Sequence, residues 1–478
     1  MNEATRISLL DRTVQNLREV WREVADRTSG VFSASPTPSL GDKDVDPIKT
    51  QMRDCLEARG GEVSARARAA NLGRTYLSLN PQGRRRFLQI LVDEFGPDRK
   101  AVDRAVANLQ KVGADPLERI KAEQDLRQIL RPPWLRLLTQ FNGLPEGVHF
   151  LVDLRAELLD FCKDDPHLAV LEKELKTLLV SWFDVGFLEM QQIKWDSPAS
   201  LLEKLIAYEA VHAIQSWDDL KNRLDADRCC FAFFHPRMPN EPLIFVEVAL
   251  VNGIADNIQN LLDQQAPVID PQRADTAIFY SISNAQAGLA GISFGSFLIK
   301  RVVDVLADEF RNLKLFATLS PIPGFCSWLN GQLKAPVAET ESKLLTASER
   351  KSLSALDLDT GKKGMIKTLL ERPDWHKKAE FAKSLKSPMM RLCAHYLAEE
   401  KRPDGIALDR VAHFHLSNGA RIERLDWLGN ISPEGLRQSA GMMVNYRYKL
   451  DDIEANHEAY TGEKRVKVSS AMRGLLRS

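Results

Sequence analysis

The stretch TAIFYSISNAQAGLAGISFGSFLIKRVVDVLADEF, residues 276–310, decides the fold because it contains a strand, a turn and a helix in immediate succession. Its first part, residues 276–284, is rich in β-branched and aromatic residues, which favour a strand. Glycines and other small residues follow up to Ser296, and the remainder has the apolar period of a helix. This succession predicts a mixed α/β domain.

The segments around this stretch extend the same pattern. Four further runs read as strands, at residues 229–235, 243–251, 313–319 and 412–416, and helical segments separate them. A central sheet flanked by helices is therefore predicted. From Ala335 to Asp409 the period is helical again, which predicts a helical insertion at about 335–409.

The N-terminal half has a different character. Between residues 47 and 185 the apolar period stays helical, and the change to strand-like runs comes after SWFDVGFLEM, residues 181–190. A chain of 478 residues also exceeds the roughly 250–300 residues at which single cores stop growing. We therefore predict an α+β protein, with a helical domain at 1–187 and an α/β domain at 188–478.

Composition and charge exclude several classes of protein. The chain is 44% hydrophobic and 27% charged, with 65 basic and 65 acidic residues, so no global field favours nucleic acid or an anionic membrane. No run approaches the roughly 18 apolar residues of a membrane helix. The acidic Glu3, Asp11 and Glu19 argue against an organelle transit peptide. We expect a cytoplasmic protein.

The six cysteines include no CxxC pair and no spacing that suits zinc, so no metal site is predicted.

The small-residue turn within residues 285–296 has two interpretations. Its glycines leave backbone N–H groups unshielded before a helix, an arrangement that receives phosphate and resembles the acyl-CoA pyrophosphate site of GNAT-type acetyltransferases. The spacing is neither GxGxxG nor a P-loop. Alternatively, the glycines only allow a strand and a helix to pack closely.

A candidate serine follows the next strand. In LKLFATLSPIPGFCSWL, residues 313–329, the strand delivers Ser320 to a loop that Pro321 and Pro323 stiffen. Such a loop holds a hydroxyl in place, but the same prolines also suit an ordinary turn. Without a GxSxG elbow there is no support for a triad-type acyl-enzyme.

Candidate histidines lie in VAHFHLSNGA, residues 411–420. In a strand His413 and His415 share one face, but no third ligand at a suitable spacing accompanies them. An inward histidine is either a core residue or a proton donor near neutral pH. Further on, NYRY brings Tyr446 and Tyr448 near a helix end, where a hydroxyl either reaches a ligand or only packs.

Taken together, these runs resemble malonyl-CoA decarboxylase over about residues 178–460. The matching pieces are SWFDVGFLEM, EAVHAI, EPLIFVEVAL, FYSIS, GSFLIKRVV, LSPIPGF, SPMMRLCAHYL, FHLSNGA and NYRY. The resemblance implies a helical N-terminal domain used in oligomerisation and an acetyltransferase-like (GNAT) catalytic domain with a helical insertion. It also implies malonyl-CoA as substrate, acetyl-CoA as product, no cofactor, and a homo-oligomer, dimer or tetramer.

The resemblance also implies site residues. Ser320 and His415 correspond to the family's catalytic pair, which implies a histidine that protonates the thioester enolate and a serine that either orients the carboxylate or accepts a proton. The remaining positions implied to bind or support the substrate are Ser281, Ala290, Gly291, Ile292, Ser293, Phe294, Gly295, Ser296 and Tyr448. Some relatives carry glutamate where this chain has Ser293, which is a departure from the pattern. The alternative functions are an acyl-CoA-dependent acyltransferase and a non-catalytic malonyl-CoA sensor.

Overall fold

A computed structural model describes residues 15–25, 36–57, 61–113, 115–292, 297–333, 343–356 and 364–477. Within them the chain divides into two compact units. One holds the residues up to Glu189 together with Phe234–Leu243 and Asn284–Ser293, and the other holds Met190–Phe233, Ile244–Ser283 and the residues from Phe294 onward. The predicted domain boundary near residue 187 stays a prediction.

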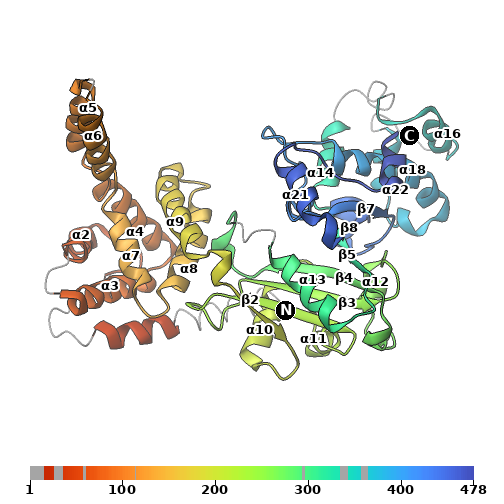
Figure 1. Cartoon of the computed structure of the whole chain (residues 1–478), viewed down its shortest axis with the longest axis horizontal. Helices are drawn as coiled ribbons and strands as arrows, with labels where there is room; N and C mark the ends of the chain where they lie inside the picture. The colour runs from red at the N-terminus through yellow and green to blue at the C-terminus, as the bar shows by residue number, and fades with distance from the viewer. Residues whose placement is uncertain are drawn as a thin grey trace. The chain divides into compact units, whose positions relative to one another are not determined.

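The first unit is built mainly from helices, coloured red to yellow in Figure 1. They are α2 (Asp42–Leu56), α3 (Gly61–Ser78), α4 (Pro81–Glu94), α5 (Arg99–Lys111), α6 (Pro116–Ile129), α7 (Trp134–Asn142), α8 (Gly147–Phe161) and α9 (Ala169–Trp182). Polar caps start several of them: the side chain of Asn80 accepts from Gly83 N, and that of Asp115 accepts from Leu117 N. The helical pattern predicted between residues 47 and 185 is confirmed for the described residues.

The second unit contains an eight-stranded mixed sheet with the order β1-β2-β3-β4-β5-β8-β6, and β7 also pairs with β8. The strands are β1 (Glu189–Ile193), β2 (Arg228–Phe234), β3 (Ile244–Val251), β4 (Thr276–Asn284), β5 (Leu315–Thr318), β6 (Ser320–Pro321), β7 (Arg421–Asp426) and β8 (Met443–Tyr448). The predicted strands at 229–235, 243–251, 276–284 and 313–319 correspond to β2, β3, β4 and β5. The predicted fold class, helical first and then mixed, is confirmed.

The connection from β4 to β5 determines where Ser320 lies. These strands are parallel, so a crossover joins them, and it contains α13 (Phe297–Glu309). Their pairing ends at Phe279 and Thr318, after which the chain continues into β6 and pairs with β8 instead. Strand β8 therefore contacts both β5 and β6, and Ser320 lies opposite Val444 of β8.

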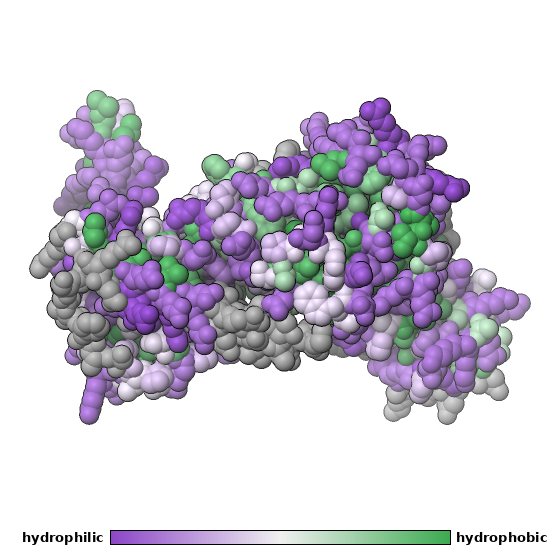
Figure 2. Space-filling view, turned by 90° about the horizontal axis from the view of Figure 1, so that it is seen from below, coloured by the Kyte–Doolittle hydropathy of each residue, from purple (hydrophilic) through white to green (hydrophobic). Residues whose placement is uncertain are grey.

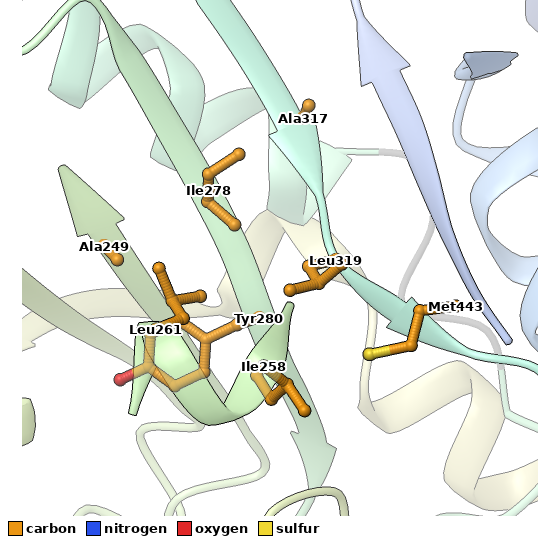
Figure 3. Packing of buried hydrophobic residues seen from close by; sticks show 8 residues of the cluster. All are labelled: Ala249, Ile258, Leu261, Ile278, Tyr280, Ala317, Leu319 and Met443. Atoms are coloured by element: carbon orange, nitrogen blue, oxygen red, sulfur yellow. The ribbon is translucent and has the colours of Figure 1, made fainter. Parts of the chain in front are cut away.

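A buried cluster fixes this part of the sheet (Figure 3). Its members come from β3, β4, β8, the segment around β5, and the short helix α12 (Ile258–Leu261). They are Ala249, Ile258, Leu261, Ile278, Tyr280, Ala317, Leu319 and Met443. Burying each large apolar side chain stabilises the fold by about 1.5–3 kcal/mol. Since Leu319 is fully buried here, the backbone of the adjacent Ser320 is held firmly.

Figure 2 shows one face of the molecule, on which hydrophilic side chains predominate and hydrophobic ones form separate small groups. Among the described helices, none has both the length and the apolar character needed to cross a membrane.

The C-terminal part of the second unit is largely helical around β7 and β8. Its helices are α14 (Phe325–Gln332), α16 (Ala347–Ser354), α17 (Met365–Leu370), α18 (Ala379–Ala398), α19 (Arg410–Ser417), α20 (Pro433–Ser439), α21 (Ile453–Thr461) and α22 (Ser470–Arg477).

Two local predictions are wrong in this region. Residues 412–416 lie in helix α19 rather than in a strand, because Asp409 caps the backbone N–H groups of Val411 and Ala412 at 2.9 Å. The helix ends just before Gly419, whose φ of 80° favours glycine. Tyr446 and Tyr448 belong to strand β8 and not to a helix end, and their separation by two residues puts them on the same face.

Candidate active site

Ser320, His415 and Tyr448 form one buried hydrogen-bonded chain. The hydroxyl oxygen of Ser320 lies 3.1 Å from Nε2 of His415, and the Tyr448 hydroxyl lies 2.8 Å from Nδ1 of the same ring. All three side chains are almost fully buried. The structure thus brings together a serine from β6, a histidine from α19 and a tyrosine from β8.

A fourth residue, Thr318, sets the direction of this chain. The Ser320 hydroxyl donates to Oγ1 of Thr318 at 2.8 Å, so the Ser320 oxygen is left to accept from Nε2–H of His415. A neutral imidazole carries one N–H, and Nδ1 of His415 therefore accepts from the Tyr448 hydroxyl. The order of donation runs from Tyr448 through His415 and Ser320 to Thr318.

The pKa values of the hydrogen-bonded side chains indicate that the group is uncharged. Burial lowers the pKa of His415 to about 3, because a charged imidazolium loses its hydration there. Burial also raises the pKa of the Tyr448 hydroxyl well above its ordinary value. At neutral pH both groups are therefore uncharged.

Packing fixes the plane of the His415 ring. Tyr446 stacks on the imidazole with 4.5 Å between ring centroids and 22° between planes. The helix that carries His415 is held at its start by Asp409, whose second carboxylate oxygen also accepts from the hydroxyl of Tyr396 at 3.2 Å. Because the stacked ring and the capped helix already fix its position, His415 loses little conformational entropy when it donates a proton.

Ser281 is not hydrogen-bonded to Ser320, His415 or Tyr448. Its hydroxyl donates to Oε2 of Glu209 at 2.7 Å, and the hydroxyl of Ser283 donates to the same oxygen at 3.1 Å. No hydrogen bond joins Ser281 to the chain of Ser320 and His415 among the described residues.

His413 does not share a face with His415. Because α19 is helical, two positions along the chain rotate the side chain by about 200°, and Nδ1 of His413 lies 2.9 Å from the Tyr460 hydroxyl instead. Within the described ranges, no group of three or more His, Cys, Asp or Glu side chains is arranged to hold a metal ion.

The predicted acyl-CoA loop, Ala290–Ser296, is only partly described. Ser293, Phe294, Gly295 and Ser296 lie outside the described residues. Just before the loop, a Cβ on Gly288 would lie 1.8 Å from the carbonyl oxygen of Val152, so this glycine serves close packing against α8. The carbonyl of Ala290 accepts from the buried guanidinium of Arg155 at 3.0 Å, and Gly291 has a φ of 70°.

A pocket of about 950 Å³ is lined by sequence neighbours of Ser320 and His415, although these two side chains are not themselves among its lining residues. Pro321 and Pro323 of the serine loop line it, together with Val411, one helical turn before His415. His212 and Arg223 also line it. The pocket is large enough for part of a thioester substrate.

Sequence reasoning missed several of these residues. Thr318 looked like an ordinary strand residue, although its separation from Ser320 by two positions was a usable signal. Asp409 was a recognisable helix cap immediately before the histidine segment. His212 and Glu209 were part of the EAVHAI run but carried no expected role.

Comparisons with known proteins agree with this architecture. Residues 95–183 match the family model of the malonyl-CoA decarboxylase N-terminal domain, and residues 186–478 match that of the malonyl-CoA decarboxylase C-terminal domain. The mitochondrial malonyl-CoA decarboxylase of the goose Anser anser anser is 40% identical, and the alignment covers 85% of this chain and 82% of the goose protein. The corresponding protein of Rattus norvegicus is 38% identical over 92% of this chain and 88% of its own length.

Solved structures lead to the same family. The crystal structure of malonyl-CoA decarboxylase from Rhodopseudomonas palustris has 42% sequence identity and a TM-score of 0.81, and the match covers 90% of this chain and 99% of that one. The Agrobacterium vitis protein has 40% identity and a TM-score of 0.79 with the same coverage. Both family models, the relatives and the structures thus confirm the resemblance seen in the sequence, and the chain belongs to the malonyl-CoA decarboxylase family.

Proposed function

We propose that this protein converts malonyl-CoA to acetyl-CoA and carbon dioxide. The observation that carries the proposal is the buried, hydrogen-bonded arrangement of Tyr448, His415 and Ser320 in a member of this family. Breaking the bond to the malonyl carboxylate leaves an electron pair that the thioester carbonyl accepts, which gives an enolate. The substrate supplies its own electron sink, so the reaction requires no cofactor.

In this mechanism Ser320 orients the carboxylate and His415 supplies a proton. The Ser320 hydroxyl turns from Thr318 to the substrate carboxylate, and burial strips that carboxylate of water. After carbon dioxide leaves, Nε2–H of His415 protonates the α carbon of the enolate, and Nδ1 takes a proton from the Tyr448 hydroxyl. Solvent then restores the proton of Tyr448.

The same geometry argues against an acyl-enzyme. A nucleophilic serine needs a neighbouring base that accepts its proton. Here Ser320 already donates to Thr318, and Nε2 of His415 faces the serine oxygen with its hydrogen.

The test is the release of carbon dioxide and acetyl-CoA from malonyl-CoA by the purified, chelator-treated protein, beside Ser320→Ala and His415→Ala. We expect metal-independent turnover that collapses in both variants. Intact protein that transfers an acyl group only when an amine is added would instead indicate an acyltransferase. Protein that returns malonyl-CoA unchanged would indicate a sensor.

Three further expectations belong to this proposal. Residues Ala290–Ser296 hold the CoA ester, and substitutions there would raise KM more than they lower kcat.

The N-terminal helices join copies of the protein into a dimer or tetramer. Size-exclusion chromatography with multi-angle light scattering measures the mass of that assembly. The expected cytoplasmic location contrasts with the word mitochondrial in the names of the goose and rat proteins, and fractionation of the source cells decides it.

A further inference from the structure

The small-residue turn before α13 packs against helices α8 and α9. Its residues Asn284–Ser293 lie in the same compact unit as these two helices. The backbone N–H groups of Leu289, Ala290 and Ile292 donate to carbonyl groups within the turn, at 3.0, 3.1 and 3.0 Å. That of Gly291 has no hydrogen-bond partner among the described residues, so it is available to a ligand.

A buried arginine of α8 holds this turn by its carbonyl groups. Arg155 is only 1% exposed; its Nη1 donates to the carbonyl oxygen of Gly288, and its Nη2 donates to that of Ala290 at 3.0 Å. Nε and Nη2 also donate to Oε1 of Glu172 in α9, at 3.0 and 2.7 Å. The carboxylate balances the buried charge, and the planar guanidinium fixes the direction of both carbonyls. The turn therefore cannot shift without breaking these bonds.

The exposed end of the turn lies beside a lysine of α9. Ala290 and Gly291 are exposed, and Nζ of Lys176 lies 3.3 Å from the position that a Cβ on Gly291 would take. No carboxylate in the described part of the chain forms an ion pair with this ammonium group. A backbone N–H and an unpaired cation side by side suit a phosphate oxygen, which accepts hydrogen bonds from both.

We propose that Arg155 is a positioning residue for substrate binding, because it holds residues 288–290 so that Gly291 and Lys176 receive the pyrophosphate of the CoA ester. This inference rests on the proposed function and deepens it, since it names groups that bind the phosphates of that substrate. The helical unit thus contributes to the affinity for the substrate and not to the step that breaks the carboxylate bond.

Three variants separate this role from a general loss of stability. Arg155→Lys keeps the charge, but a single ammonium group cannot bind Glu172 and both carbonyls together. Lys176→Gln removes the charge that contacts the phosphate. The matched control is Arg84→Lys, since Arg84 binds Glu157, also in α8, and has hydrogen bonds to backbone carbonyls outside the turn.

Three substrates show which part of the ligand is recognised. Malonyl-phosphopantetheine and malonyl-pantetheine differ by a single phosphate, the one that forms the inner half of the pyrophosphate in malonyl-CoA. All three carry the same malonyl thioester. A KM that changes only for the substrates with this phosphate therefore reports contacts to it.

We expect Arg155→Lys to raise KM about tenfold for malonyl-CoA and malonyl-phosphopantetheine, with kcat and the KM for malonyl-pantetheine nearly unchanged. Lys176→Gln raises the same two KM values about three- to fivefold, as for a partly exposed ion pair. Arg84→Lys lowers the melting temperature and leaves all KM values unchanged.

Two patterns would overturn the inference. An equal rise in KM on all three substrates, or a rise as large in Arg84→Lys, would make Arg155 structural only. A rise for malonyl-CoA without one for malonyl-phosphopantetheine would place the nucleotide, and not the pyrophosphate, at the turn. If Arg155→Lys does not fold, Glu172→Gln decides instead: it loosens the guanidinium, and an unchanged KM for malonyl-CoA in that variant refutes the role.

Binding of acetyl-CoA, measured by calorimetry, separates this inference from the proposed function. If the intact protein releases no carbon dioxide, the proposed function fails, whereas a weaker affinity for acetyl-CoA in Arg155→Lys and Lys176→Gln still supports the phosphate site. Normal turnover with an unchanged KM for malonyl-CoA in both variants refutes the phosphate site and leaves the proposed function standing.

Discussion

The hydroxyl of Ser320 donates to the hydroxyl oxygen of Thr318, two residues earlier in the chain, at 2.8 Å. Thr318 Oγ1 also accepts from the backbone N–H of Tyr446 at 3.1 Å, and Tyr446 stacks on His415. Thr318 therefore contacts both parts of the site, because its hydroxyl oxygen accepts hydrogen bonds from the Ser320 hydroxyl and from the backbone of the strand beside His415.

Replacing Thr318 separates these two roles. Thr318→Val keeps the shape but removes the acceptor, so the Ser320 hydroxyl loses its orientation and we expect kcat to fall about tenfold. Thr318→Ser keeps the acceptor and most of the activity. Steady-state kinetics measures both, and circular dichroism gives the melting temperature. If Thr318→Val melted earlier but kept kcat, Thr318 would be structural only.

His413, two residues before His415, provides a matched control for substitutions of His415. We expect His415→Ala to lower kcat by about 100- to 10,000-fold, because it removes the proton donor. Tyr448→Phe removes the hydroxyl at Nδ1 and is expected to cost about tenfold. His413→Ala, two residues away and bonded to Tyr460, leaves kcat nearly unchanged. A loss at His413 as large as that at His415 would contradict the assignment.

The buried imidazole also makes stability depend on pH. The pKa of His415 is about 3 in the folded protein, whereas an unfolded histidine titrates near 6.5. Between these values the unfolded chain binds more protons, so this contribution to stability is full above about pH 6.5 and declines as the pH falls.

His415→Asn removes that dependence. Its loss of stability between pH 6.5 and 4 is expected to be shallower than that of the intact protein by up to about 1.4 kcal/mol per pH unit. Thermal unfolding across this pH range measures the difference, with His395→Asn, at an exposed histidine, as the reference. Parallel curves for the intact protein and His415→Asn would show that the folded ring titrates normally.

Substitutions of Gly324 and Gly331 test whether the Tyr396–Asp409 contact stabilises the start of α19. A Cβ on Gly324 would lie 2.1 Å from the Tyr396 hydroxyl, which is itself bonded to Asp409, the cap of α19. We expect Gly324→Ala to lower both stability and kcat. Gly331, in helix α14, has open space at this position, and Gly331→Ala is expected to be neutral or to stabilise by up to about 1 kcal/mol. Equal behaviour of the two variants would show that the Tyr396 contact relaxes freely.

Half of the eight strands, β2 to β5, were predicted because they are continuous apolar runs bounded by turns, whereas β1, β6, β7 and β8 were not predicted. Residues 276–284 match β4 at both ends, and 243–251 differ from β3 by one residue. The histidine segment was not predicted correctly, because alternation over so few residues fits a strand as well as a helix. The capping hydrogen bonds of Asp409 to Val411 and Ala412 decide between them, and Asp409 is itself held by the hydroxyl of Tyr396 in α18.

The site was predictable only in part. The resemblance named Ser320, His415 and Tyr448, and the structure brings these three together. It also named Ser281, whose hydroxyl is instead committed to Glu209. Spacing alone does not reveal which hydroxyl a carboxylate 72 positions away will take.

Because His415 lies on a helix and not on a strand, the segment between Asp409 and His415 is intolerant of any change in length. In a strand, a two-residue insertion returns a side chain to its original face. In α19, each inserted or deleted residue turns the imidazole by about 100° and moves it along the axis by about 1.5 Å. A single-codon insertion or deletion between Asp409 and His415 would therefore take the ring away from both Ser320 and Tyr448, whereas a point substitution leaves its position along the helix unchanged.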